Sequence, residues 1–106
     1  MDMTFLPLVT VVTETYKNFD YLENNIKSVL RQTYTPIEYI IADDGSGNFP
    51  LDRVKQIIEE NKRDNIIDVK FLISKENKGT VKNEGNAYHS ASGYILMPLA
   101  GDDEFY

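Results

Sequence analysis

Two pairs of adjacent aspartates are the first candidates for chemistry in this sequence. Asp43-Asp44 follows one short apolar run, and Asp102-Asp103 follows another. Mg²⁺ and Mn²⁺ are commonly held by one or two carboxylates together with substrate phosphates. An acidic pair after a strand is also common as a turn or a helix cap, so each pair alone has that simpler interpretation. Together the pairs predict a site for Mg²⁺ or Mn²⁺, provided that the fold brings them to one place.

Several lysines near these pairs could offset the charge of a diphosphate. They are Lys17, Lys75, Lys78 and Lys82. The start of a helix near Thr80 would add backbone N–H donors for the same anion. Taken singly, each lysine is also typical of a solvated surface, so the prediction depends on the group.

Two ring side chains also lie close to these segments. Tyr16 follows an apolar run and could stack on a nucleobase, although a tyrosine at such a position is as often a packing residue. His89 has no acidic or cysteine partner at the spacing of a metal site. We therefore interpret His89 as a structural or surface residue.

Apolar runs and amphipathic stretches alternate along the chain and indicate the elements that must position these residues. Strands are predicted over four ranges: Leu8–Thr13, Ile37–Ala42, Val69–Ile73 and Tyr94–Leu99. A first helix is predicted after a cap at Asn18 or Asp20, with Glu23 completing a capping box. A second begins near Pro50, and a third covers roughly Thr80–Ala91.

This order of elements predicts an α/β fold, a three-layer α/β/α arrangement around a mostly parallel sheet. Ligands of such sheets bind beyond the carboxyl ends of the strands. That rule selects four loops, which are Glu14–Asn18, Asp43–Gly47, Ser74–Gly79 and Gly101–Glu104. Both aspartate pairs fall within these loops, so the fold is expected to bring them to one edge.

Composition narrows the function classes. The 106 residues suffice for one compact domain, and the absence of cysteine excludes disulfides and thiolate metal sites. The net charge of −6 argues against nucleic acid as a partner, because such binding depends on a basic face. No apolar run approaches the roughly 20 residues of a membrane span. We expect a cytoplasmic protein, with the inner face of the membrane as the alternative location.

The ordered set of motifs resembles the start of family 2 inverting glycosyltransferases with the GT-A fold. The resemblance runs from about residue 8 to the end of the chain. The matching segments are Thr15-Tyr16, Tyr21-Leu22, Ser28-Val29-Leu30-Arg31-Gln32-Thr33-Tyr34, Asp43-Asp44-Gly45-Ser46, Asn77-Lys78-Gly79, Lys82-Asn83-Glu84-Gly85 and Gly93-Tyr94-Ile95 with Gly101-Asp102-Asp103. The chain departs from the family pattern at Glu14, where proline or threonine is usual, at Lys17, where asparagine is usual, and at Ala100, where an acid is usual.

The resemblance implies a role for each candidate residue. The nucleotide of a nucleotide-diphospho-sugar donor, with UDP-sugar as the expected class, would be bound by Thr13, Glu14, Tyr16, Asp44, Lys82 and Asp102. The divalent metal, Mg²⁺ or Mn²⁺, would be held by Asp102 and Asp103. Metal charge would stabilise the leaving diphosphate as sugar is transferred to an acceptor hydroxyl.

The resemblance also implies that a complete GT-A domain is roughly twice this length. We therefore expect residues 1–106 to be a truncated domain without its acceptor half, without a catalytic base and inactive alone. The last predicted strand would then leave an apolar sheet edge that could form a homodimer.

Two other classes stay open at this point. One is a non-catalytic nucleotide-binding or assembly module. The other is a receiver-type phospho-acceptor signalling domain, which would need an acceptor aspartate at the end of the third strand, where this sequence has Ile73-Ser74.

Overall fold

The computed structural model describes residues 6–17, 19–77, 79, 85, 87, 89–93 and 95–100. Its elements, in chain order, are β1 (Val9–Thr15), α1 (Leu22–Leu30), β2 (Ile37–Asp43), α2 (Leu51–Asn61), β3 (Ile66–Ile73) and β4 (Ile95–Ala100). The predicted alternation of strands and helices is confirmed for these elements. The third predicted helix is described at Gly85, Ala87, His89 and Ser90, which are helical, and at Ala91, which is not. Its predicted start at Thr80 lies outside the described residues.

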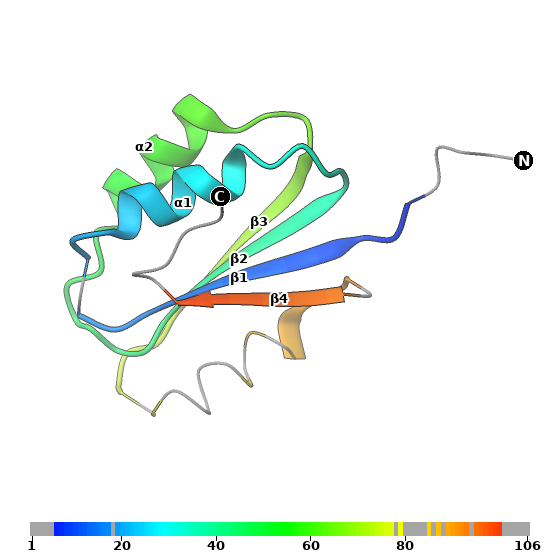
Figure 1. The fold of residues 1–106 in the computed structure, drawn as a ribbon. Helices are drawn as coiled ribbons and strands as arrows, with labels where there is room; N and C mark the ends of the chain where they lie inside the picture. The colour runs from blue at the N-terminus through cyan, green and yellow to red at the C-terminus, as the bar shows by residue number, and fades with distance from the viewer. Residues whose placement is uncertain are drawn as a thin grey trace, which may run out of the picture.

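The four strands form one parallel sheet in the order β3-β2-β1-β4 (Figure 1). Near the start of β1, Val9 lies opposite both Ile37 and Ile95; near its end, Glu14 lies opposite Ala42 and Ala100. Because the strands are parallel and their register brings their ends level, their carboxyl ends lie at one edge of the sheet. The predicted convergence of the loops after β1, β2 and β3 at this edge is confirmed.

One face of the sheet packs against α1 and α2 and holds the larger core. β-Branched residues dominate the strands here, because they pack well on a pleated surface. The core comprises Val9, Val11, Ile37, Tyr39 and Ile41 from the sheet with Leu22, Ile26, Val29, Leu30, Val54, Ile57 and Ile58 from the helices. Burial raises the pKa of the Tyr39 phenol, which stays neutral in this core.

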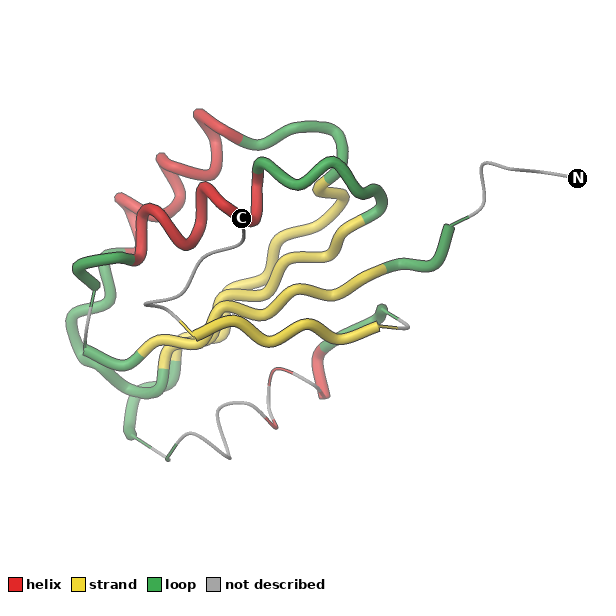
Figure 2. The backbone as a smooth tube through the Cα atoms, viewed as in Figure 1, coloured by secondary structure: helices red, strands yellow, loops and turns green. Residues whose placement is uncertain are grey.

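The opposite face carries the helical segment that precedes β4, as Figures 1 and 2 show. Ala87 of that segment is fully buried against Val12, Ile40 and Ala42. The sheet is therefore covered on both faces, and the predicted three-layer arrangement is confirmed. Among the described residues, no helix has the length and apolar character that crossing a membrane would require.

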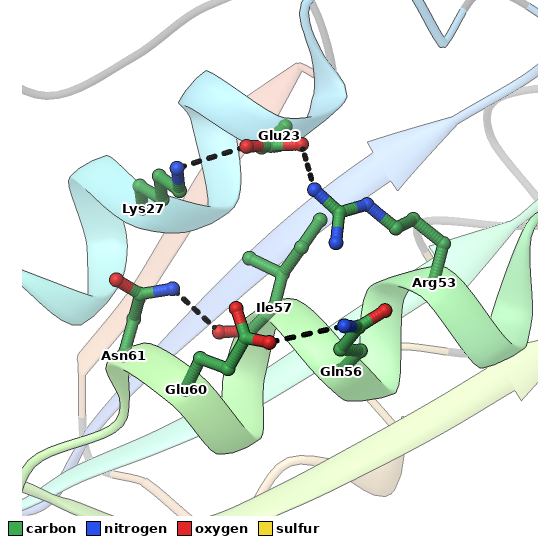
Figure 3. Close-up of polar contacts among 7 residues, drawn as sticks. All are labelled: Glu23, Lys27, Arg53, Gln56, Ile57, Glu60 and Asn61. Atoms are coloured by element: carbon green, nitrogen blue, oxygen red, sulfur yellow. Dashed lines mark hydrogen bonds and ion pairs between the residues drawn. The ribbon is translucent and has the colours of Figure 1, made fainter.

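The residue before α1 lies one position after Asp20, which is one of the two predicted caps. Tyr21 is the residue before α1, and its side chain makes no capping hydrogen bond. The carboxylate of Glu23 instead bridges the two helices, 2.8 Å from Lys27 on α1 and 2.8 Å from Arg53 on α2 (Figure 3). Glu23 thus pairs with cations on both helices, and a capping box between Asp20 and Glu23 stays a prediction.

A buried ionic cluster ties three strands to the segment that leads into β4. Glu38 on β2 is 2% exposed and lies 2.9 Å from the Lys70 ammonium on β3. Its other oxygen accepts hydrogen bonds from the Thr10 hydroxyl and from the Ser92 N–H, both at 2.8 Å. The Gly93 N–H donates to the Thr10 hydroxyl at 2.9 Å. These bonds fix the point from which β4 enters the sheet.

Candidate functional site at the carboxyl edge of the sheet

The first loop at this edge follows β1 and presents Tyr16 and Lys17. Tyr16 is 43% exposed, which leaves much of its ring open to a ligand. Lys17 adopts a left-handed backbone conformation with φ of 59°. Its N–H donates to the Ser46 hydroxyl at 2.7 Å, which ties the loop after β1 to the loop after β2. The Lys17 ammonium lies 5.2 Å from the centre of the Tyr16 ring.

Asp43, the last residue of β2, is committed to shaping its own loop. It is fully buried, and one carboxylate oxygen accepts from the Thr15 hydroxyl at 2.7 Å and from the Ser46 hydroxyl at 2.6 Å. The other oxygen accepts from the Ser46 N–H at 2.9 Å. For Asp43, the turn interpretation of the acidic pair is therefore the one that the structure supports.

Asp44 has different surroundings, although it directly follows Asp43. It is 4% exposed, and its N–H donates to the Thr15 carbonyl at 3.0 Å. One carboxylate oxygen accepts from the Gly79 N–H, in the loop after β3, at 2.9 Å. A carboxylate offers about four acceptor positions, so Asp44 can bind more than one donor at the same time.

The loop after β3 lies directly against the loop after β2. Gly45 has a φ of +75°, and a Cβ there would be 2.2 Å from the carbonyl carbon of Glu76 and 2.3 Å from the nitrogen of Asn77. Only a residue without a side chain fits this approach. The Asn77 side chain reaches the Tyr16 phenol, and hydrogen bonds from Asn77 and then Lys17 lower the pKa of that phenol.

Two of the predicted nucleotide-binding residues lie in β1 itself. The Thr13 side chain is fully buried, and its hydroxyl is 2.7 Å from the Asn25 amide oxygen and 2.6 Å from the Tyr39 hydroxyl. Thr13 thus supports the site from within the core. Glu14 is half-buried and lies level with the last residue of β4, Ala100.

The remaining predicted site residues, Lys82, Asp102 and Asp103, lie outside the described residues. In the part of the chain that the structure describes, no group of three or more His, Cys, Asp or Glu side chains could hold a metal. The position of β4 bears on whether a cation would fit at this edge. β4 pairs in parallel with β1, and its last residue, Ala100, lies level with Glu14 at this edge. In the sequence, Asp102 and Asp103 follow after Gly101, and carboxylate oxygens are ligands that suit Mg²⁺ or Mn²⁺.

His89 comes from an element outside these loops. It is exposed on the helical segment before β4 and borders a shallow hollow with residues 71–74 and Ser90. No shared contact connects it to Tyr16 or Asp44 among the contacts of the described residues. The interpretation of His89 as a surface residue is confirmed.

Two residues of the site were missed as individual candidates. Asn77 belongs to an Asn-x-Gly element and Ser46 to the loop after β2, and neither was predicted as a site residue by itself. Their contacts join loops from different strands. A signal in the sequence existed, because amide and hydroxyl side chains in strand-end loops commonly bond neighbouring backbone groups.

Comparison with known proteins finds a matching family model and several similar proteins. The model of the family described as Glycosyl transferase family 2 matches residues 10–106. TuaG of Bacillus subtilis, a glycosyltransferase named for teichuronic acid biosynthesis, is 35% identical over 93% of this chain and 37% of its own length. The chain spans about a third of the length of TuaG and of two relatives from Haemophilus influenzae, and about a tenth of the length of two synthases from Pasteurella multocida.

Solved structures support the fold. A mannosyltransferase of Pyrobaculum calidifontis, in complex with GDP-Man and Mn²⁺, superposes with a TM-score of 0.82 at 21% identity, over 96% of this chain and 29% of that one. TarS 1-349 of S. aureus, in complex with UDP, superposes with a TM-score of 0.75 at 22% identity, over 91% and 28%.

Proposed function

Because the chain belongs to glycosyl transferase family 2, we propose that it binds the nucleotide of a nucleotide-diphospho-sugar, with UDP-sugar as the donor class. The protein then transfers the sugar to an acceptor hydroxyl. The observation that carries the proposal is the meeting of Tyr16 and Asp44 at the carboxyl edge of the sheet. An exposed aromatic ring and a nearly buried carboxylate there suit a nucleobase and its N–H or ribose hydroxyl donors.

The described residues divide the work of holding the nucleoside. Tyr16 offers its exposed ring for stacking, and Asp44 accepts from the base or the ribose. Asp44 is preset because the Gly79 N–H already holds one of its oxygens. Glu14 lies at the same edge, near the end of β1. The buried Thr13 holds β1 in place through hydrogen bonds to the side chains of Asn25 and Tyr39.

The diphosphate is proposed to lie toward β4. Lys82 would offset its charge, and Asp102 with Asp103 would hold Mg²⁺ or Mn²⁺ against it. The support is the register that ends β4 level with Glu14, together with the oxygen ligands that follow. A divalent cation there would neutralise charge that develops on the leaving diphosphate.

We propose that the acceptor site and the general base lie in a part of the protein that corresponds to the unmatched part of its longer relatives. The relatives are about three times as long as the matched segment, which leaves room for an acceptor site. The 106 residues then correspond to the donor-binding part of a GT-A domain. A polysaccharide or glycolipid under synthesis is the kind of acceptor that we propose.

The two competing classes differ from this proposal in identifiable features. A receiver domain needs an aspartate at the end of its third strand; β3 ends at Ile73, followed by Ser74, whose N–H donates to the Asp43 carbonyl. That class is disfavoured. A non-catalytic module would share the nucleotide site and differ only in lacking transfer by the whole protein.

A thermal-shift screen separates donor binding from the receiver class and from an assembly module that lacks a donor site. A ligand that binds only the folded state raises its stability in proportion to the logarithm of ligand concentration over Kd. We expect UDP with Mn²⁺ to raise the Tm and beryllofluoride with Mg²⁺ to leave it unchanged. Stabilisation by beryllofluoride alone would support a receiver domain, and stabilisation by neither would leave a module without the proposed donor site.

A further inference from the structure

The loop after β2 holds both of the peptide units that flank Tyr16. On one side of Tyr16, the Thr15 carbonyl accepts from the Asp44 N–H at 3.0 Å. On the other side, the Lys17 N–H donates to the Ser46 hydroxyl at 2.7 Å. The backbone of the proposed stacking residue is therefore bonded twice to the loop that carries the proposed base acceptor.

The Ser46 hydroxyl accepts one of these bonds and donates another. It donates to the Asp43 carboxylate at 2.6 Å, and the Ser46 N–H donates to the other oxygen of that carboxylate at 2.9 Å. A hydroxyl can donate one hydrogen bond while it accepts a second, which an alanine at this position could not do. Ser46 thus connects the fully buried Asp43 to the turn after β1.

The turn that Ser46 holds contains an uncommon backbone conformation. Lys17 has a φ of 59°, in the left-handed region, which residues with a side chain adopt rarely. Such a conformation persists only where its surroundings hold it. In this conformation the Lys17 ammonium lies over the Tyr16 ring, 5.2 Å from its centre. Loss of the Ser46 hydroxyl would therefore allow the turn to relax and the Tyr16 ring to change its position.

We propose that Ser46 is a positioning residue for the nucleoside, which holds the Tyr16 ring in a fixed place relative to the Asp44 carboxylate. The inference rests on the proposed nucleotide-binding function. Its physical basis is preorganisation, because a binding group that is already in place loses less conformational entropy when the ligand binds. Ser46 acts through the backbone of Tyr16 and need not touch the base.

The test is a double-mutant cycle on the 106-residue chain, with Ser46→Ala, Tyr16→Ala and the double variant. Calorimetric titration with UDP and Mn²⁺ measures the Kd of each. We expect Tyr16→Ala to weaken UDP binding roughly tenfold or more, the effect of losing a stacking ring. Ser46→Ala should weaken it roughly three- to tenfold, the range for one lost hydrogen bond. In the Tyr16→Ala background, Ser46→Ala should change the Kd by less than about twofold, because the ring that Ser46 positions is gone.

Two further variants separate the hydroxyl from the loop as a whole. Ser46→Thr keeps a hydroxyl at the same position and should bind UDP within about twofold of wild type. Ser90→Ala is the matched control, since Ser90 is also a half-buried serine and accepts from Lys70 through its backbone carbonyl, which the variant keeps. It should bind UDP as wild type does. Inorganic pyrophosphate with Mn²⁺ is the base-free probe, and its affinity should stay within about twofold of wild type in every variant.

The outcomes separate this inference from the function on which it rests. An unchanged Kd for UDP in Ser46→Ala would overturn the inference and keep the function. A loss of the same size in the Tyr16→Ala background would also overturn it, because Ser46 would then act independently of the ring. So would an equal loss in Ser46→Thr, or equal losses for UDP and pyrophosphate. Failure of wild type to bind UDP, with or without Mn²⁺, would overturn both.

Discussion

At the scale of single residues, two adjacent aspartates have acquired different tasks from their surroundings. Asp43 is enclosed by Thr15 and Ser46, which take up both of its oxygens. Asp44 accepts instead from the Gly79 N–H, in the loop after β3. The type and spacing of the pair predicted a site at this position. The division of roles depended on loop contacts from β1 and β3, which no local pattern encodes.

Asp44 should matter for the nucleoside independently of metal. We expect Asp44→Ala to weaken UDP binding in both EDTA and Mn²⁺, by about 1–3 kcal/mol for a lost charge-assisted hydrogen bond. Asp102→Asn should instead remove most of the difference between EDTA and Mn²⁺. Calorimetric titration of both variants under both conditions checks this. A purely metal-dependent loss in Asp44→Ala would contradict the role given to Asp44.

For His89, in contrast to Asp44, we expect substitution to have little effect on nucleotide binding. Its side chain is exposed on the helical segment before β4, and among the described residues no contact joins it to Tyr16 or Asp44. We expect His89→Gln to change UDP affinity by less than about 1 kcal/mol, as for an ordinary surface substitution. Fluorescence-based binding measurements are sufficient. A loss of tenfold or more would show that this segment contributes to the nucleotide site.

At the scale of elements, the buried Glu38 cluster determines how β4 joins the sheet. The strands themselves were predictable, because β-branched runs alternate with amphipathic segments. β3 was predicted to begin at Val69 but begins at Ile66. The charged Asp68 interrupts the apolar pattern before Val69, so the pattern does not show the first residues of the strand. The pairing of Lys70 with Glu38 was not predictable, because it needs the register of β2 against β3.

This cluster should make stability depend on pH. Burial alone would raise the pKa of Glu38, but hydrogen bonds from Ser92, Lys70 and Thr10 outweigh it, and the pKa lies below its ordinary value of 4.5. The folded state therefore binds the Glu38 proton more weakly than the unfolded state does. The resulting stability is fully present above pH 4.5 and is lost as the pH falls through the lowered pKa.

Lys70→Met should test the ion pair directly. It leaves the Glu38 carboxylate buried without its cation, and we expect a loss of about 3 kcal/mol in the free energy of unfolding. Urea unfolding at pH 7 measures the loss. Lys27→Met, in the exposed pair with Glu23 (Figure 3), is the matched control and should cost less than about 1 kcal/mol. Equal effects of the two variants would contradict the account.

At the scale of the whole molecule, the strand order places β4 at one end of the sheet. Among the described residues, β4 is paired with β1 alone. Its sequence, Ile95 to Ala100, is apolar and contains one proline, Pro98, which cannot donate to a neighbouring strand. An apolar strand at a sheet edge is a template for pairing with another chain.

We therefore predict that the 106-residue chain self-associates and transfers no sugar. Light scattering at about 0.1 mM, well above the micromolar Kd values of ordinary interfaces, should detect dimers or larger species. Leu96→Lys should reduce association, because charge on an edge strand discourages pairing. A strict monomer would contradict the first prediction. Sugar transfer from a UDP-sugar by these residues alone would contradict the second.

The central claim is that this edge of the sheet binds a nucleoside diphosphate together with a divalent metal. Calorimetric titration of UDP into the wild-type chain, once with Mn²⁺ and once with EDTA, tests it most directly. We predict saturable one-to-one binding in both conditions, with clearly higher affinity in Mn²⁺ because the cation offsets diphosphate charge. Equal affinity in Mn²⁺ and EDTA would contradict the metal role, and no binding in either condition would contradict the nucleotide site itself.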